Sequence, residues 1–148
     1  MQSIQANSYP IHFNEKGYEA LNLHLKENKY SNLFIIVDSN TNEFCLPNFL
    51  PYLETELAIE IIEFDAGEEN KNIETCVQIW NVLTELGADR KSLVINLGGG
   101  VVTDLGIKDF IIRESNLTKY DVPIIENIPI VLPTNIPVNI AFAFFLSK

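Results

Sequence analysis

The chain has 148 residues, of which 47% are apolar and 20% charged, and this ordinary globular composition allows one domain with a substantial core. Its 20 acidic and 10 basic side chains give a net charge of -10. A field of that sign repels phosphate backbones and anionic lipid, so nucleic acid and membrane surfaces are not expected partners. The N-terminus lacks a signal-peptide pattern and no apolar stretch is long enough to span a bilayer, so we expect a cytoplasmic location.

Cysteines and histidines, which are common zinc ligands, are few. The two cysteines, Cys45 and Cys76, stand far apart without a CxxC pattern, and we predict reduced, buried thiols. The two histidines, His12 and His24, lie near the N-terminus and do not supply three convergent ligands. The sequence therefore predicts no metal site, and with no Ser-His-Asp or Cys-His arrangement evident it leaves the catalytic residues unknown.

Two short strands and a helix are predicted at the start of the chain. The strands span residues 3–6 and 9–13, and we expect Pro10 at a sheet edge because proline cannot donate a ladder hydrogen bond. From Glu15 to about Asn28 apolar residues recur at helical spacing, which predicts an amphipathic helix.

A continuous apolar run at residues 33–37 predicts a strand that is buried on both faces. Short polar side chains follow it. Asp38 and Asn40 are candidates for contacts with a ribose or a base, because ligands of open α/β sheets bind outside the carboxyl ends of the strands. The alternative is an Asx turn, in which these side chains bond only to neighbouring backbone.

The middle of the chain predicts a short helix at 47–52, a strand at 58–64 and, after a polar turn, a second long helix that ends near Gly87. We expect Asn70 to cap this helix. Its predicted inner face carries Ile73, Val77, Trp80 and Leu83.

Lys71 is the only cation between Lys29 and Arg90. An isolated lysine in an acidic stretch is usually a solvated charge. Its position after a predicted strand end also makes Lys71 a candidate ligand-binding residue.

The stretch from Leu93 to Gly106 reads LVINLGGGVVTDLG and predicts a strand, a tight turn and a helix that starts near Val101. Glycine lets a ligand approach the main chain closely, and the first N–H groups of a helix attract a pyrophosphate. The stretch therefore indicates a nucleotide site, although a glycine turn without a ligand stays open as the alternative. It does not match the GxGxxG fingerprint.

Strands alternate with helices up to residue 106, which predicts an α/β, Rossmann-like fold in which a mostly parallel sheet is flanked by helices in a single domain. We place the nucleotide-binding domain at residues 1–106. Residues 107–148 differ in composition, because their acidic and basic side chains balance, and we expect this divergent segment to complete the sheet.

Three motifs at successive strand ends together resemble the N-terminal domain of 3-dehydroquinate synthase. They are Val-Asp-Ser-Asn-Thr at 37–41, Gly-Glu-Glu-Asn-Lys at 67–71 and Gly-Gly-Gly-Val-Val-Thr-Asp-Leu-Gly at 98–106. The resemblance covers roughly residues 9–106. Its glycine and aspartate part is shared with related sugar-phosphate cyclases and the glycerol dehydrogenase group, whereas the Gly-Glu-x-x-Lys part favours the synthase.

The resemblance implies a lyase of the shikimate pathway, which serves aromatic amino acid biosynthesis. In that family 3-deoxy-arabino-heptulosonate 7-phosphate, a small phosphorylated sugar acid, loses phosphate and cyclises with the help of NAD and a divalent metal, zinc or cobalt, held by a C-terminal domain. A homodimer is also expected. The implied cofactor contacts are Asp38 and Asn40 at the adenosine ribose, Glu68 and Lys71 at the cofactor, Gly98, Gly99, Gly100 and Val101 along the pyrophosphate, and Asp104 near the nicotinamide.

After Gly106 the family's next motifs, a paired-threonine strand followed by Asp-Ala-Ser and Gly-Gly-Lys, are absent, and only residues 128–135 faintly echo that strand. We therefore expect a truncated or divergent N-terminal portion that binds NAD and is inactive alone, because the metal-binding half is missing. The alternatives are a fragment of a related sugar-phosphate cyclase or polyol dehydrogenase, and a non-catalytic interaction module.

Overall fold

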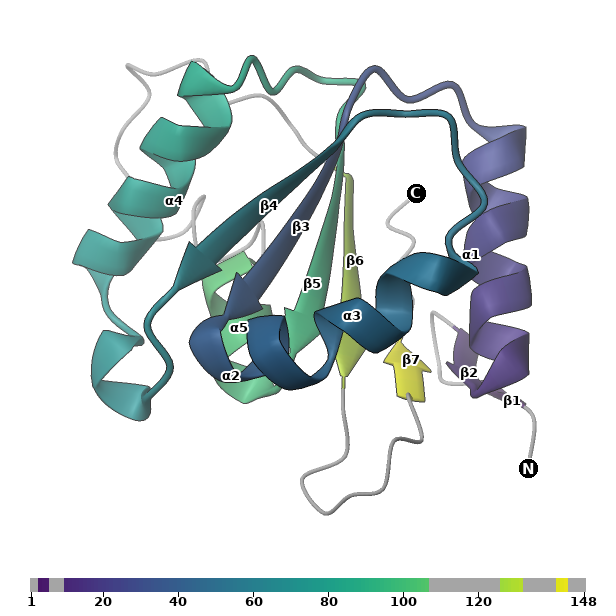
Figure 1. Ribbon diagram of the computed structural model, residues 1–148, viewed down its shortest axis with the longest axis horizontal. Helices are drawn as coiled ribbons and strands as arrows, with labels where there is room; N and C mark the ends of the chain where they lie inside the picture. The colour runs from purple at the N-terminus through teal and green to yellow at the C-terminus, as the bar shows by residue number, and fades with distance from the viewer. Residues whose placement is uncertain (1–2, 6–9, 107–125, 132–140, 144–148) are drawn as a thin grey trace.

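The computed structural model describes residues 3–5, 10–106, 126–131 and 141–143 (Figure 1). Its strands form one seven-stranded sheet in the order β1-β2-β7-β6-β5-β3-β4. The strands are β1 (Ser3–Gln5), β2 (Pro10–Phe13), β3 (Leu33–Asp38), β4 (Ile59–Phe64), β5 (Leu93–Gly98), β6 (Glu126–Val131) and β7 (Ala141–Ala143). The helices are α1 (Glu15–Glu27), α2 (Ser39–Phe44), α3 (Leu46–Phe49), α4 (Ile73–Glu85) and α5 (Gly100–Gly106), with 3-10 turns η1 (Leu50–Tyr52) and η2 (Glu68–Asn70).

The sheet has a parallel half and an antiparallel half. Strands β4, β3, β5 and β6 run parallel, whereas the pairs β1–β2, β2–β7 and β6–β7 are antiparallel. The parallel half with its flanking helices confirms the predicted Rossmann-like α/β fold. No helix of the described residues is long and apolar enough to cross a membrane.

Both faces of the central strands are covered, because successive side chains of a strand point to opposite sides. On one face, Leu33, Ile35 and Val37 of β3 pack with residues of β5, α1 and α3. On the other face, Phe34 and Ile36 pack with residues of β4, β5, α4 and α5. All five of these β3 side chains are at most 1% exposed, which confirms the strand predicted to be buried on both faces.

The N-terminal predictions hold in outline, with two corrections. Pro10 is not at a sheet edge, because β2 lies between β1 and β7. Proline is tolerated there since it is the first residue of the strand and pairs with Gln5, while pairing with β7 begins at Ile11. Residues 39–44, for which no helix was predicted, form α2, because Asp38 supplies a capping box that starts a helix directly after β3.

Helix α4 corrects the sequence reading twice. Asn72, not Asn70, caps it, and the Asn72 side chain accepts a hydrogen bond from the Thr75 N–H at 2.9 Å. The buried side carries Thr75, Cys76, Ile79 and Leu83, whereas two residues of the predicted inner face, Ile73 and Val77, are 50% and 41% exposed. Apolar residues lie on two adjacent sides of this helix, so their spacing alone did not decide which side packs.

The segment after Gly106 contributes two strands. Strand β6 pairs in parallel with β5, and β7 joins β6 to β2. β6 includes residues 128–131 of the segment that faintly resembles the family's threonine strand, while residues 132–135 lie outside the described residues.

Both cysteines are free thiols. Cys76 is buried as predicted, whereas Cys45 is half-buried.

Candidate functional site

Three strand ends meet at one edge of the parallel half. Asp38 pairs with Phe64 across β3 and β4, and Ile36 pairs with Asn96 across β3 and β5. All three strands point the same way, so the residues that follow them come together below the arrowheads in Figure 1. The predicted site residues all lie on these three segments, at the edge where open α/β sheets bind ligands.

Asp38 has a structural task at this edge. Its Oδ1 accepts a hydrogen bond from the Thr41 N–H at 2.7 Å, and the Thr41 hydroxyl lies 2.9 Å from the Asp38 nitrogen and accepts from it. One carboxylate oxygen of Asp38 therefore bonds to neighbouring backbone, as the Asx-turn alternative predicted. Asn40, on the helix that Asp38 caps, is exposed to solvent. A carboxylate has lone pairs beyond this one bond, so the contact leaves Asp38 able to accept further hydrogen bonds.

Lys71 is not an isolated solvated charge. Its Nζ lies 2.5 Å from Asp104 Oδ2 and 3.4 Å from Glu68 Oε1. The hydrogen bond and charge of Asp104, followed by the charge of Glu68, raise the pKa of Lys71. Three predicted cofactor residues from two segments are thus brought together, with side chains that are 39% (Lys71), 46% (Asp104) and 75% (Glu68) exposed.

The three glycines after β5 have different surroundings. A Cβ on Gly98 would lie 2.3 Å from a methyl group of Val102, whereas a Cβ on Gly99 or Gly100 would meet nothing within 4 Å. None of the three has a positive φ, so the turn does not need glycine for its backbone angles. Gly98 is therefore required for packing between β5 and α5, and Gly99 and Gly100 leave open space where a ligand can approach the main chain.

Thr103 holds this turn and was missed by the sequence reading. Its N–H donates to the Gly99 carbonyl at 3.0 Å, and its hydroxyl lies 3.1 Å and 3.0 Å from the Gly99 and Gly100 carbonyls. The side chain is 9% exposed. Its position four residues after Gly99 was the available signal, since a threonine hydroxyl can bond the carbonyl one helical turn back.

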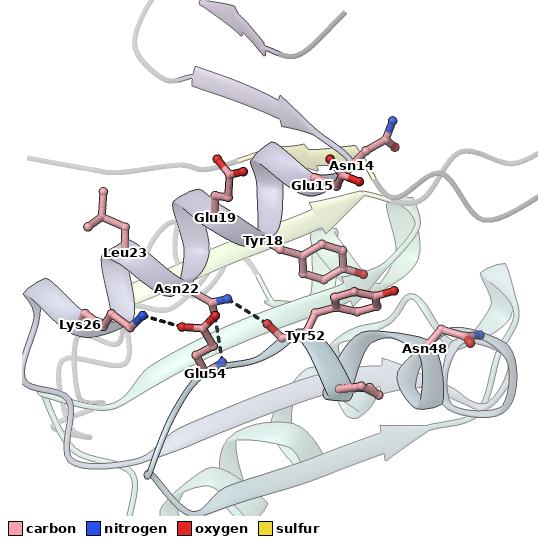
Figure 2. Close-up of a pocket in the computed structure, with 11 residues that line it drawn as sticks. Asn14, Glu15, Tyr18, Glu19, Asn22, Leu23, Lys26, Asn48, Tyr52 and Glu54 are labelled. Carbon is pink, nitrogen blue, oxygen red and sulfur yellow. Dashed lines mark hydrogen bonds and ion pairs between the residues drawn. The ribbon is translucent and has the colours of Figure 1, made fainter.

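A cavity of about 760 Å³ lies elsewhere, between α1 and the α3–η1 segment (Figure 2), and no predicted site residue lines it. Its polar groups bond to one another: Asn22 Nδ2 donates to the Tyr52 carbonyl at 2.9 Å, Asn22 Oδ1 accepts from the Glu54 N–H at 3.0 Å, and Lys26 pairs with Glu54. Tyr18 stacks on Tyr52 at 4.5 Å, and burial together with Tyr52 raises the pKa of Tyr18 to about 12. These contacts hold η1 on α1.

Comparison with known proteins supports the family resemblance. Residues 61–111 match the family model described as 3-dehydroquinate synthase N-terminal. A 3-dehydroquinate synthase of Parabacteroides distasonis is 42% identical over 78 residues, which are 53% of this chain, and one of Clostridium kluyveri is 34% identical over 107 residues, or 70% of this chain. The predicted resemblance to 3-dehydroquinate synthase is confirmed.

The matches to 3-dehydroquinate synthase also set limits. The chain spans only 22% and 29% of the length of these two relatives. The match to the family model extends five residues beyond Gly106, to residue 111. It also begins at residue 61, so the motif at 37–41 lies outside the part of the chain that the family model matches.

Solved structures show the same fold. A 2-deoxy-scyllo-inosose synthase is similar with a TM-score of 0.55 at 22% identity over 64% of this chain and 27% of its own chain. A second structure of that enzyme, complexed with carbaglucose-6-phosphate, NAD+ and Co2+, has a TM-score of 0.61 at 19% identity and covers 80% of this chain and 30% of its own. At these identities the two neighbours show that the described part of this chain shares their fold.

Proposed function

We propose that this chain is the NAD-binding, N-terminal portion of a 3-dehydroquinate synthase, and that NAD binds across the carboxyl ends of β3, β4 and β5. The observation that carries the proposal is the convergence of the three family motifs at one sheet edge, with open space over Gly99 and Gly100. The sequence matches to 3-dehydroquinate synthases, and a structural neighbour that contains NAD, support it.

Each residue has a physical role in this proposal. Carboxylate and amide groups of Asp38 and Asn40 hydrogen-bond ribose hydroxyls. The main chain from Gly99 to Val101 faces the pyrophosphate, where the first N–H groups of α5 have no partner within the helix and can donate. Lys71 and Asp104, already in contact, orient the nicotinamide end together with Glu68.

NAD would supply transient oxidation of a substrate hydroxyl when bound, and this chain's residues bind and orient it. The family's metal has no comparable place: among the residues that the structure describes, no three histidine, cysteine or acidic side chains come together as ligands. We therefore propose cofactor binding without turnover for this chain alone, with a phosphorylated sugar acid as the substrate of the complete enzyme.

Calorimetric titration of the 148-residue chain with NAD, alongside ADP-ribose, tests the proposal. Binding in the micromolar to low-millimolar range is expected for both ligands. Gly99→Val should abolish it and Gly99→Ala should weaken it, since the side chain occupies the space over the turn, while thermal unfolding stays unchanged because that space is empty of protein atoms. Full affinity in folded Gly99→Val would contradict the site, and no binding by the unsubstituted folded chain would favour the interaction module.

A further inference from the structure

A hydrogen bond between side chain and backbone joins the segments after β3 and β4. The Ser39 hydroxyl oxygen accepts from the Ala66 N–H at 3.1 Å, although the two residues are 27 apart in the sequence. Ser39 is the first residue of α2, directly after the cap Asp38. Ala66 follows the end of β4 and precedes η2. Neither family motif explains this contact, because Ala66 lies outside both of them.

Both backbone groups of Ala66 are bonded. While its N–H donates to Ser39, its carbonyl accepts from Asn70 Nδ2 at 3.2 Å. The next residue, Gly67, has a φ of 128°, an angle that L side chains rarely adopt. The chain therefore leaves the sheet at a fixed residue and turns sharply there, and Ser39 is the contact that joins this fixed residue to the neighbouring strand segment.

The position of Ala66 helps to set where Lys71 lies, together with helix α4, whose cap Asn72 follows Lys71 directly. Only η2 and its flanking residues separate Ala66 from Lys71, and the turn is closed by hydrogen bonds from the Asn70 N–H to the Gly67 carbonyl and from the Lys71 N–H to the Glu68 carbonyl, both 3.1 Å. At its far end the segment is attached by the ion pair of Lys71 with Asp104. That pair is substantially exposed, and exposed ion pairs hold weakly. The bond to Ser39 is then the half-buried anchor of the segment.

We propose that Ser39 is a positioning residue for nucleotide binding: its hydroxyl fixes Ala66 and thereby places Glu68 and Lys71 at the cofactor crevice. The inference rests on the proposed function and adds a residue that does not itself touch the cofactor. Removal of one neutral hydrogen bond predicts a loss of NAD affinity of about three- to tenfold in Ser39→Ala. Ser39→Thr keeps the hydroxyl and should keep the affinity.

The experiment compares Ser39→Ala and Ser39→Thr with Asn42→Ala in the full chain. Asn42 is the matched control: it lies on the same helix, and its Nδ2 donates to Glu63 Oε2 at 2.7 Å, a contact from α2 to β4 that lies before the turn. NAD affinity by calorimetry and hydrogen exchange of the Ala66 amide are measured for each variant. We expect Ser39→Ala alone to weaken NAD binding and to accelerate exchange at Ala66.

Unchanged affinity in Ser39→Ala overturns the proposal, and so does an equal loss in Asn42→Ala, which would indicate a general effect of loosening α2. If Ser39→Thr loses as much affinity as Ser39→Ala, the hydroxyl is not the cause and the proposal also fails. If the unsubstituted chain binds no NAD, both proposals fail, whereas exchange at Ala66 still reports whether Ser39 anchors the turn. The two failures are thereby distinguished.

Discussion

The two ends of the parallel strands carry polar residues of similar kinds that are arranged in opposite ways. At the amino ends, Asp89 Oδ1 accepts from the Ser31 hydroxyl at 2.6 Å, from the Ser92 hydroxyl at 3.1 Å and from the Lys91 N–H at 2.8 Å. The Ser92 hydroxyl in turn accepts from the Asp89 N–H at 2.9 Å. These groups bond within one compact cluster that joins the segments before β3 and β5.

At the carboxyl ends, polar groups reach from one strand's segment to the next. Ser39 bonds Ala66, Lys71 pairs with Asp104, and Gly99 and Gly100 leave main chain uncovered by side chains. Contacts at both ends join the segments of neighbouring strands. The difference is that those at the amino ends form one closed cluster, whereas those at the carboxyl ends leave the main chain at Gly99 and Gly100 uncovered. A polar residue next to a strand is therefore a candidate for ligand binding when it lies at the carboxyl end, and a candidate for a structural role when it lies at the amino end.

The largest effect is expected at Gly98. Replacing it with alanine places a Cβ 2.3 Å from a buried Val102 methyl group, so Gly98→Ala should lower the free energy of unfolding by about 1–3 kcal/mol. A Cβ on the neighbouring Gly99 would meet no atom within 4 Å, so Gly99→Ala should leave the free energy of unfolding unchanged. Urea unfolding of both variants measures the difference. Equal loss in both would show that the whole turn, and not Gly98 alone, is closely packed.

A smaller effect is expected at the amino ends. Ser92 is fully buried, and Ser92→Ala removes its hydrogen bonds with Asp89, so we expect a loss of about 1–2 kcal/mol in the free energy of unfolding. NAD affinity should not change, because the cluster lies at the opposite ends of the strands. Chemical denaturation measures the free energy of unfolding, and calorimetry measures the NAD affinity. Reduced NAD affinity in a fully folded Ser92→Ala chain would contradict the claim that the amino ends of the strands do not contribute to NAD binding.

The smallest effect is a pH dependence at Asp89. Its hydrogen bond from Ser31, followed by that from the Lys91 N–H, lowers the pKa of Asp89. The unfolded value is about 3.9, so the stabilisation is complete above that pH and is lost as the pH falls through the lower folded pKa. The stability difference between the unsubstituted chain and Asp89→Asn should therefore shrink below about pH 4. A stability difference that stays constant with pH would refute the assignment.

Much of the fold could be predicted from the sequence where pattern and packing agree. The buried run before Asp38 and the apolar run before Gly98 could form only interior strands, and both do. The prediction failed at α4, where two apolar sides competed and the sheet selected the one with Cys76. Helix α2 was missed because the polar residues at 38–41 suit a turn and a helix cap equally well.

The candidate site was predictable as a set of residues but not as a set of contacts. Motifs located Lys71 and Asp104, yet their ion pair joins segments whose distance depends on the whole sheet. Gly98 is close to a packed side chain and Gly99 is not, and this difference depends on where Val102 packs, which the spacing of residues in the sequence does not give. Ser39 was missed because its partner is a backbone group 27 residues away in the sequence. Thr103 was missed although its spacing from Gly99 is compatible with a hydrogen bond to the carbonyl one helical turn back.

Strand β7 has a consequence for the order in which the protein folds. It pairs residues 11–13 of β2 with residues 141–143, so this part of the sheet joins residues that are far apart in the sequence. Such non-local pairing slows folding, because the entropy of closing the loop is lost before the contacts form. Among the described strands, β2 has only β1 as a partner until β7 has been synthesised. The residues of β2 thus reach their final neighbours late.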